Sequence, residues 1–404
     1  MSRARRLLIY SPDSFGLGHF RRCLSIAREL SIADPALSVL CLTGSPKPSL
    51  FAYPRGFDTV KLPSLTKDAD GAYQSLSGNL ELARLAALRT SIVDATLRDF
   101  EPDLLLVDHA PLGTLGELLP VLERLRGDPS VTTVLGLRDV IDSPERTAAE
   151  WAERDLARRV PELFDRVLVY GDPRVWNTIE RYGLGAALGE RATHTGIVCR
   201  CMPKPARPSG FDGPARRGRV LITTGGGADG LPIVEDALHA LAGWNGPVRA
   251  ILGPLADPQV GERLRALARA LPDCTLIGSS RAMCREVRDA DAVIAMAGYN
   301  TAYETLRAGR LFFAVPRHGP RLEQRVRAAR LAELGLAVAV DSDPASRRAS
   351  LAHALSTTRS ADLPPAALRP DFRGARRAAA HLHEWLLASP RAAAPLSQAA
   401  GGAP

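Results

Sequence analysis

The sequence DADAVIAMAGYNTAYETLRAGRLFFAVPRHGPRLEQ, residues 289–324, has the pattern of one β-α-β unit. An apolar strand is expected at 292–295, and a helix of about two turns is expected after it, because helices in α/β units begin directly after such a turn. Gly309 ends that helix, and a second apolar strand is expected at 311–315. The rest of the chain is interpreted around this unit.

The turn between strand and helix predicts an anion site. Free backbone N–H groups and the positive end of a helix dipole face outward there, and both favour phosphate. The residues of the turn are Gly298, Tyr299, Asn300 and Thr301. Glu304 follows one turn into the helix, where a carboxylate suits a ribose diol. The alternative is a solvated acidic residue that only favours the start of the helix.

A polar cluster follows the second strand. Pro316, Arg317 and His318 come first, and Glu323 and Gln324 follow shortly after. In open α/β sheets, ligands bind beyond the carboxyl ends of the strands. We therefore expect the turn, Glu304 and this cluster to face one ligand.

Together these residues resemble the sugar-nucleotide signature of GT-B glycosyltransferases of the family-28, MurG-like type. In that signature an acidic residue six positions after the loop glycine holds the ribose, which corresponds to Glu304 after Gly298. An acid or amide pair after the strand proline holds the sugar hydroxyls, which corresponds to Glu323 and Gln324. The resemblance implies two Rossmann-like α/β domains with parallel sheets facing across a cleft, the donor being bound by the second domain.

A second candidate site lies near the N-terminus. A strand is expected at 7–10, and Gly16, Gly18 and His19 precede a helical apolar pattern. A dinucleotide fingerprint is excluded, because Arg21 occupies the third glycine position and no acidic residue ends the next strand at 39–43. A helix N-terminus favours a neutral imidazole, which suits a general base. The alternative for His19 is a surface residue capping the helix.

The motif around His19 also resembles the nucleotide-sugar hydrolase of pseudaminic acid biosynthesis, in which the matching histidine activates water. In many GT-B transferases a base or acceptor-site histidine stands there. The resemblance therefore supports His19 in either role.

Two aspartates follow strands of the first half. Asp108 follows a strand at 104–107 and Asp139 follows one at 131–137, so a parallel sheet would place both on the same rim as His19. Either could orient His19 or bind the acceptor, and either could instead cap a following helix.

Further contacts to the nucleotide are implied by the family pattern. Arg200, four residues after Gly196, corresponds to an arginine that meets the pyrophosphate, and Met283 corresponds to the position beside the uracil. Gly225, Gly226 and Gly227 form a loop that can bring N–H groups to a phosphate. Solvent exposure for Arg200 and core packing for Met283 are the alternatives.

The 404 residues predict two domains. We expect an N-terminal acceptor domain at 1–201, a linker rich in proline, glycine and arginine at 202–218, and a donor domain at 219–371. A last helix at 372–388 is expected to pack back on the first domain, as in GT-B proteins, and a disordered tail is expected at 389–404.

Composition restricts the function classes. A hydrophobic content of 46% and a charged content of 24% are globular values. No apolar run is long enough to span a membrane. The formal charge of +8 fits an anionic ligand, with peripheral membrane contact as the less favoured alternative, and the aromatic content of 5% argues against nucleic acid. Six scattered cysteines predict a cytoplasmic protein without a structural metal.

Together with the resemblance to family-28 GT-B proteins, the sequence predicts a metal-independent glycosyltransferase without a cofactor, and the resemblance implies that it inverts the anomeric centre. Its expected donor is a nucleotide-sugar, UDP-linked, and its expected acceptor is a small or peptidic molecule. A hydrolase that uses His19 to activate water is the first alternative, and a non-catalytic nucleotide-binding protein is the second.

Overall fold

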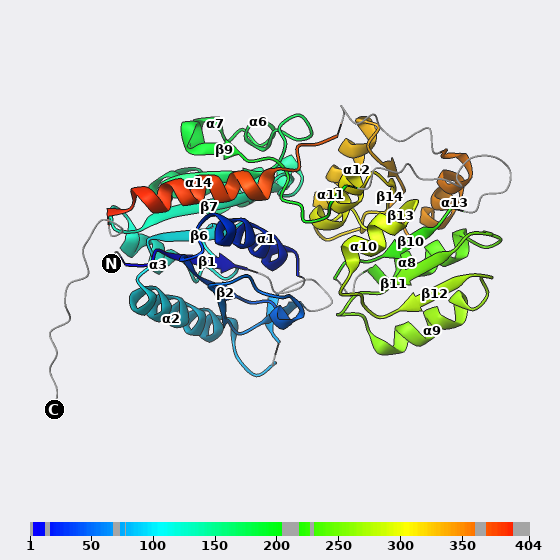
Figure 1. Ribbon diagram of the computed structural model, residues 1–404, viewed down its shortest axis with the longest axis horizontal. Coiled ribbons are helices and arrows are strands. Elements are labelled where there is room, and N and C mark those ends of the chain that lie inside the picture. The colour runs from blue at the N-terminus through cyan, green and yellow to red at the C-terminus, as the bar shows by residue number, and fades with distance from the viewer. Residues whose placement is uncertain are drawn as a thin grey trace.

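The computed structural model describes residues 3–12, 17–67, 73–76, 78–203, 218–226, 230–359 and 369–390. They form two lobes side by side, each built on a parallel β-sheet with helices against its faces (Figure 1). This is the α/β architecture that the alternation of apolar strands and helical segments predicts. No helix in these ranges is long and apolar enough to cross a bilayer.

The first lobe contains a seven-stranded sheet with all neighbouring strands parallel. Its strands, in spatial order, are β3 (Phe57–Lys61), β2 (Ser38–Thr43), β1 (Arg6–Ser11), β6 (Leu104–Asp108), β7 (Thr132–Arg138), β8 (Arg166–Tyr170) and β9 (Ala192–His194). The strand β1 is buried on both faces: Leu7 and Ile9 belong to one apolar cluster, and Leu8 and Tyr10 belong to another. Continuous apolar runs are typical of such doubly covered strands.

The helices of this lobe connect the strands along the chain. They are α1 (Gly18–Ala33), α2 (Leu82–Phe100), α3 (Leu119–Leu125), α4 (Pro144–Glu153), α5 (Leu156–Leu163), α6 (Thr178–Arg181) and α7 (Gly185–Leu188), with the 3-10 turns η1 (Pro48–Leu50) and η2 (Gly189–Arg191). A short antiparallel pair is formed by β4 (Leu65–Lys67) and β5 (Tyr73–Ser75). The sequence pattern did not reveal β3, β4 or β5.

The second lobe contains a six-stranded parallel sheet. Its strands, in spatial order, are β12 (Cys274–Ile277), β11 (Val248–Ile251), β10 (Val220–Thr223), β13 (Ala292–Ala295), β14 (Leu311–Ala314) and β15 (Val338–Ala339). Its helices are α8 (Leu231–Ala240), α9 (Pro258–Ala268), α10 (Met283–Asp289), α11 (Tyr299–Ala308), α12 (Glu323–Glu333) and α13 (Arg347–Thr357).

The quoted β-α-β unit is β13, α11 and β14. Gly298 is the N-cap residue of α11 and keeps extended backbone angles, whereas Gly309 ends the helix with a φ of 69°. That left-handed conformation is the usual helix stop for which glycine is preferred. The unit therefore forms for the reasons that its sequence pattern indicates.

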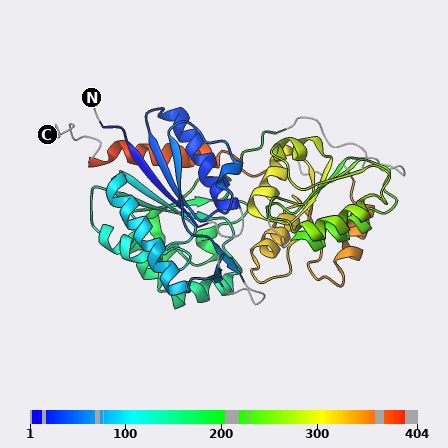
Figure 2. The same ribbon diagram turned by 90° about the horizontal axis from the view of Figure 1, so that it is seen from below.

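The last helix, α14 (Gly374–Ala388), lies against α1 of the first lobe, as both views show (Figures 1 and 2). The chain therefore crosses between the lobes twice. Of the expected linker at 202–218, only 202, 203 and 218 are described, and the expected tail lies outside the described residues from 391 onward.

Candidate functional site

A cavity of about 1900 Å³ lies between the two lobes. Its wall contains residues at or just beyond the carboxyl ends of β1, β6 and β7 in the first sheet and of β10, β13 and β14 in the second. The carboxyl ends of both parallel sheets therefore meet at one space, which is where α/β sheets bind ligands.

His19 stands in the first turn of α1 and lines this cavity. The N-cap residue of the helix, Leu17, provides no side-chain hydrogen bond to the exposed N–H groups. Nδ1 of His19 lies 2.6 Å from Oδ2 of Asp108, and the side chain of His19 is 22% exposed. A proton on Nδ1 that is donated to Asp108 leaves Nε2 as the nitrogen that can accept another proton, as general base chemistry requires.

Asp108 is fully buried at the end of β6 and is held by Arg22 of α1. Arg22 donates from Nε to Oδ1 at 3.0 Å and from Nη2 to Oδ2 at 2.6 Å. Burial alone would raise the pKa of the Asp108 carboxyl, but the Arg22 charge and the hydrogen bond with His19 lower it below its ordinary value. Asp108 is therefore ionised at neutral pH and can stabilise a protonated His19.

His109 belongs to the same group, although the sequence did not single it out as a site residue. Its ring stacks on that of His19 with centroids 5.3 Å apart, and its Nε2 lies 2.8 Å from Nη2 of Arg138. Burial and the nearby Arg138 charge hold the pKa of His109 well below its ordinary value, so the ring is neutral. The aspartate-histidine pair at the end of an apolar strand was the only sequence signal for this residue.

Asp139 has a different environment from the one expected for a partner of His19. It is fully buried and accepts from Nη2 of Arg327 at 2.7 Å, from Nε of Arg327 at 2.9 Å and from the Tyr303 hydroxyl at 2.6 Å. It is not among the residues that line the cavity. Asp139 thus connects the lobes by a buried ion pair, and Asp108 is the carboxylate that orients His19.

The opposite wall of the cavity is made by two turns of the second lobe. After β10, Gly225 has a φ of 76° and lines the cavity together with Gly226. After β13, the turn that begins α11 lines it with Gly298, Tyr299, Asn300 and Thr301. The N-terminus of α11 therefore faces the cavity, as an anion site requires.

Some side chains of these turns also join the lobes. The amide of Asn300 donates to the Gly18 carbonyl oxygen at 3.2 Å, and the Tyr299 hydroxyl donates to the Tyr170 carbonyl oxygen at 2.8 Å. The turn at 298–301, which was predicted to hold phosphate, is thus fixed directly against the first turn of α1, which carries the predicted general base His19. Gly16 and Gly227, which were also predicted as site residues, lie outside the described residues.

Glu304 lines the cavity from α11 and is 4% exposed. One of its carboxylate oxygens, Oε1, accepts a hydrogen bond from Nη2 of Arg21 on α1. The interpretation of Glu304 as a solvated surface residue is therefore wrong. A diol at this place would share the carboxylate with Arg21.

Glu323 and Gln324 begin α12 and also line the cavity. Oε1 of Glu323 accepts from Nη2 of Arg317 at 2.6 Å, whereas its buried Oε2 has no hydrogen-bond partner among the described residues. Burial alone would raise the pKa of Glu323, but the charges of Arg317 and Arg138 lower it, so the group is ionised. An unpartnered buried carboxylate oxygen in a cavity wall is an acceptor for a ligand hydroxyl group.

The remaining predicted residues divide into two groups. Arg200 and Met283 line the cavity, and Met283 also packs against the apolar core. His318 is exposed and is not among the lining residues.

Comparison with known proteins agrees with this architecture. No family model matches the chain. An uncharacterised glycosyltransferase of Methanosarcina mazei is 24% identical over 335 residues, which cover 79% of this chain and 82% of that protein. MurG of Acinetobacter baumannii superimposes with a TM-score of 0.55 at 16% identity, covering 95% of this chain and 99% of that one. MnaA of S. aureus, solved with UDP, gives 0.59 at 12% identity, covering 95% and 97%. The chain has the GT-B fold.

The GT-B fold explains why the site residues are far apart in the sequence. Each lobe contributes the carboxyl edge of its own sheet, so His19 with Asp108 and Glu304 with Glu323 reach the cleft from different halves of the chain. The predicted fold class is confirmed, and so is the resemblance to MurG-like GT-B proteins.

Proposed function

We propose that the chain is a glycosyltransferase that moves a sugar from a nucleotide donor, UDP-linked, to a hydroxyl group of a small or peptidic acceptor. The observation that carries the proposal is the wall formed by Glu323 and Gln324 in a GT-B cleft. Oε2 of Glu323 is buried without a partner among the described residues, and hydroxyl groups of a donor sugar would satisfy it. The MnaA complex with UDP supports the choice of nucleotide.

The transfer would be a single displacement that inverts the anomeric centre. The acceptor oxygen attacks the anomeric carbon, His19 accepts the hydroxyl proton at Nε2, and the bond to the nucleoside diphosphate breaks. The leaving group carries the released negative charge. The Gly225–Gly226 loop, the N-terminus of α11 and Arg200 line the cleft. Their N–H groups and positive charge would stabilise the leaving group, so the proposal requires no metal ion.

Binding experiments with UDP and a UDP-sugar test the donor site. Glu304→Gln is expected to weaken both ligands, because a ribose diol loses a charged acceptor, at a cost of about 1–3 kcal/mol. Glu323→Gln is expected to weaken the UDP-sugar by a similar amount and to leave UDP unchanged. Glu333→Gln, an exposed carboxylate on the same helix as Glu323, is the control. Unaltered UDP affinity in Glu304→Gln, measured by calorimetry, would refute the assignment.

Hydrolysis of the donor is the second candidate, because the His19–Asp108 pair can activate water as readily as a hydroxyl group. Incubation of the protein with UDP-sugars alone separates the two. Stoichiometric release of UDP and free sugar supports hydrolysis, whereas turnover that requires an acceptor supports transfer. We place the protein in the cytoplasm, a proposal supported by the six cysteines, which form no disulfide bond in the part of the chain that the structure describes.

A further inference from the structure

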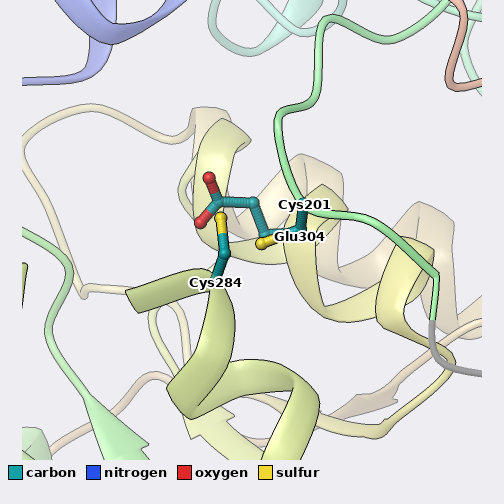
Figure 3. A group of neighbouring side chains, drawn as sticks. All are labelled: Cys201, Cys284 and Glu304. Atoms are coloured by element: carbon teal, nitrogen blue, oxygen red, sulfur yellow. The ribbon is translucent and has the colours of Figure 1, made fainter. Parts of the chain in front are cut away.

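Two cysteines and a glutamate converge beside the cavity from three separate segments. Cys201 lies on the chain that crosses between the lobes, Cys284 lies in the first turn of α10, and Glu304 lies on α11 (Figure 3). Their two sulfur atoms and a carboxylate oxygen all lie within 4.8 Å of one another. Among the described residues, this is the one group of three or more potential ligands that is arranged in this way.

The spacing is close to that of a metal's coordination shell. Zinc binds thiolate sulfur at about 2.3 Å and carboxylate oxygen at about 2.0–2.2 Å, so tetrahedral ligand atoms lie roughly 3.4–3.8 Å apart. Ligand atoms within 4.8 Å of one another would have to approach by at most about 1 Å to reach that separation. Two sulfur ligands exclude magnesium and calcium, which prefer oxygen, and select a thiophilic ion.

Two arginines and a thiol hydrogen bond surround the three candidate ligands. The thiol of Cys201 donates a hydrogen bond to the sulfur of Cys284. Arg200 forms a further hydrogen bond with Cys284, and Arg21 is paired with Glu304 through Oε1 only. Two arginines therefore compensate part of the charge of the three ligands, and the second carboxylate oxygen can turn to an ion.

We propose that Cys201, Cys284 and Glu304 form a binding site for one thiophilic divalent ion of the zinc class. The ion would tie the interdomain connection at Cys201 to α10 and α11 of the second lobe. Because Glu304 is also the carboxylate proposed above for the ribose diol, the ion and the ribose would compete for its second oxygen. Spacing rules for zinc motifs do not detect this site, because its two cysteines are far apart in the sequence.

Cobalt titration of the reduced, chelator-treated full chain tests this site, because cobalt bound to thiolate has a charge-transfer absorption band. We expect the band to saturate at one ion per chain and to disappear on addition of zinc, which binds such sites more tightly. Cys284→Ser should abolish the band, and Glu304→Gln should weaken cobalt binding at least tenfold. Cys274→Ser, a half-buried cysteine on β12, is the matched control and should retain the band.

Zinc protection from alkylation gives a second, independent measurement. Peptide mass spectrometry should show that zinc slows modification of Cys284 and leaves that of Cys274 unchanged. Absence of the cobalt band, or a band of equal strength in Cys284→Ser, would overturn the proposal. Because Cys284 is only half-buried, its serine variant serves even if Cys201→Ser, which changes a fully buried residue, fails to fold.

Discussion

His19 is the residue that can react with a ligand in the cavity, and Asp108 holds it in position. His19 is partly exposed to the cavity, whereas Asp108 is buried between Arg22 and the imidazole. Replacement of His19 with alanine should therefore lower donor turnover by about 100-fold or more, the usual contribution of a general base, with little change in the free energy of unfolding. Steady-state kinetics and thermal unfolding of the same preparation measure both quantities. Turnover that is unchanged in the variant would remove His19 from the reaction.

His109 makes stability depend on pH. The pKa of the folded residue is held well below 6.5 by burial and by Arg138, so below pH 6.5 the unfolded chain binds a proton that the folded chain does not. This part of the stability is complete above pH 6.5 and is lost as the pH falls toward the folded pKa, by at most about 1.4 kcal/mol per pH unit. Urea unfolding at pH 7.5 and 5.5 measures it.

His109→Asn supplies the comparison for that measurement. Asparagine tolerates the left-handed backbone of residue 109, where φ is 67°, and it does not titrate in this range. We expect the variant to lose less stability between the two pH values than the natural chain. Equal losses would assign the effect to other histidines, of which His194 also has a lowered pKa through burial.

At the scale of elements, α12 is attached to the end of β7 by the Arg327–Asp139 ion pair, both partners of which are buried. Arg327→Met should lower the free energy of unfolding by about 3–5 kcal/mol, because it leaves a buried carboxylate without a counter-charge. Arg325→Met on the exposed side of the same helix should change it by less than about 0.5 kcal/mol. Part of the loss should return in the Asp139→Asn, Arg327→Met double variant, and chemical denaturation of all three checks this.

The strands show what the sequence can and cannot predict. Strands β1, β6, β10 and β13 are doubly buried apolar runs, so local pattern alone locates them. In contrast, β3 has the burial of a partly exposed edge strand, and its charged residues hide the pattern. A local sequence pattern therefore says least about a strand that is stabilised mainly by pairing with its neighbour, as β3 is by pairing with β2.

For the candidate site, too, the sequence predicts what depends on local pattern and misses what depends on contacts between distant segments. Glu304, Glu323 and Gln324 were identified from their positions in and after one β-α-β unit and from the resemblance to the sugar-nucleotide signature. The structure places all three in the cavity wall. Glu304 is paired with Arg21, and Asp139 is paired with Arg327. In each pair the arginine comes from the other lobe, so no spacing within one segment reveals it. Contacts made only by tertiary folding therefore account for what the sequence missed.

At the scale of the whole molecule, the return of α14 makes the first lobe depend on the end of the chain. Leu382 of α14 is fully buried in the apolar cluster that also contains residues of α1 and α11. Leu382→Ala should lower the free energy of unfolding by about 2–5 kcal/mol, because it leaves a cavity in that cluster. Leu387→Ala, at a 51% exposed position of the same helix, should have little effect.

Hydrogen exchange locates the consequence of Leu382→Ala. If α14 supports the first lobe, amide protons of α1 and β1 should exchange faster in the variant, while those of β10 and β11 should change less, because the latter strands lie in the other sheet. Equal acceleration in both lobes would instead show that the shared apolar cluster, which runs from α1 through α11 to α14, makes the two sheets unfold as one unit. Unchanged exchange in α1 would show that α14 contributes no support to the first lobe.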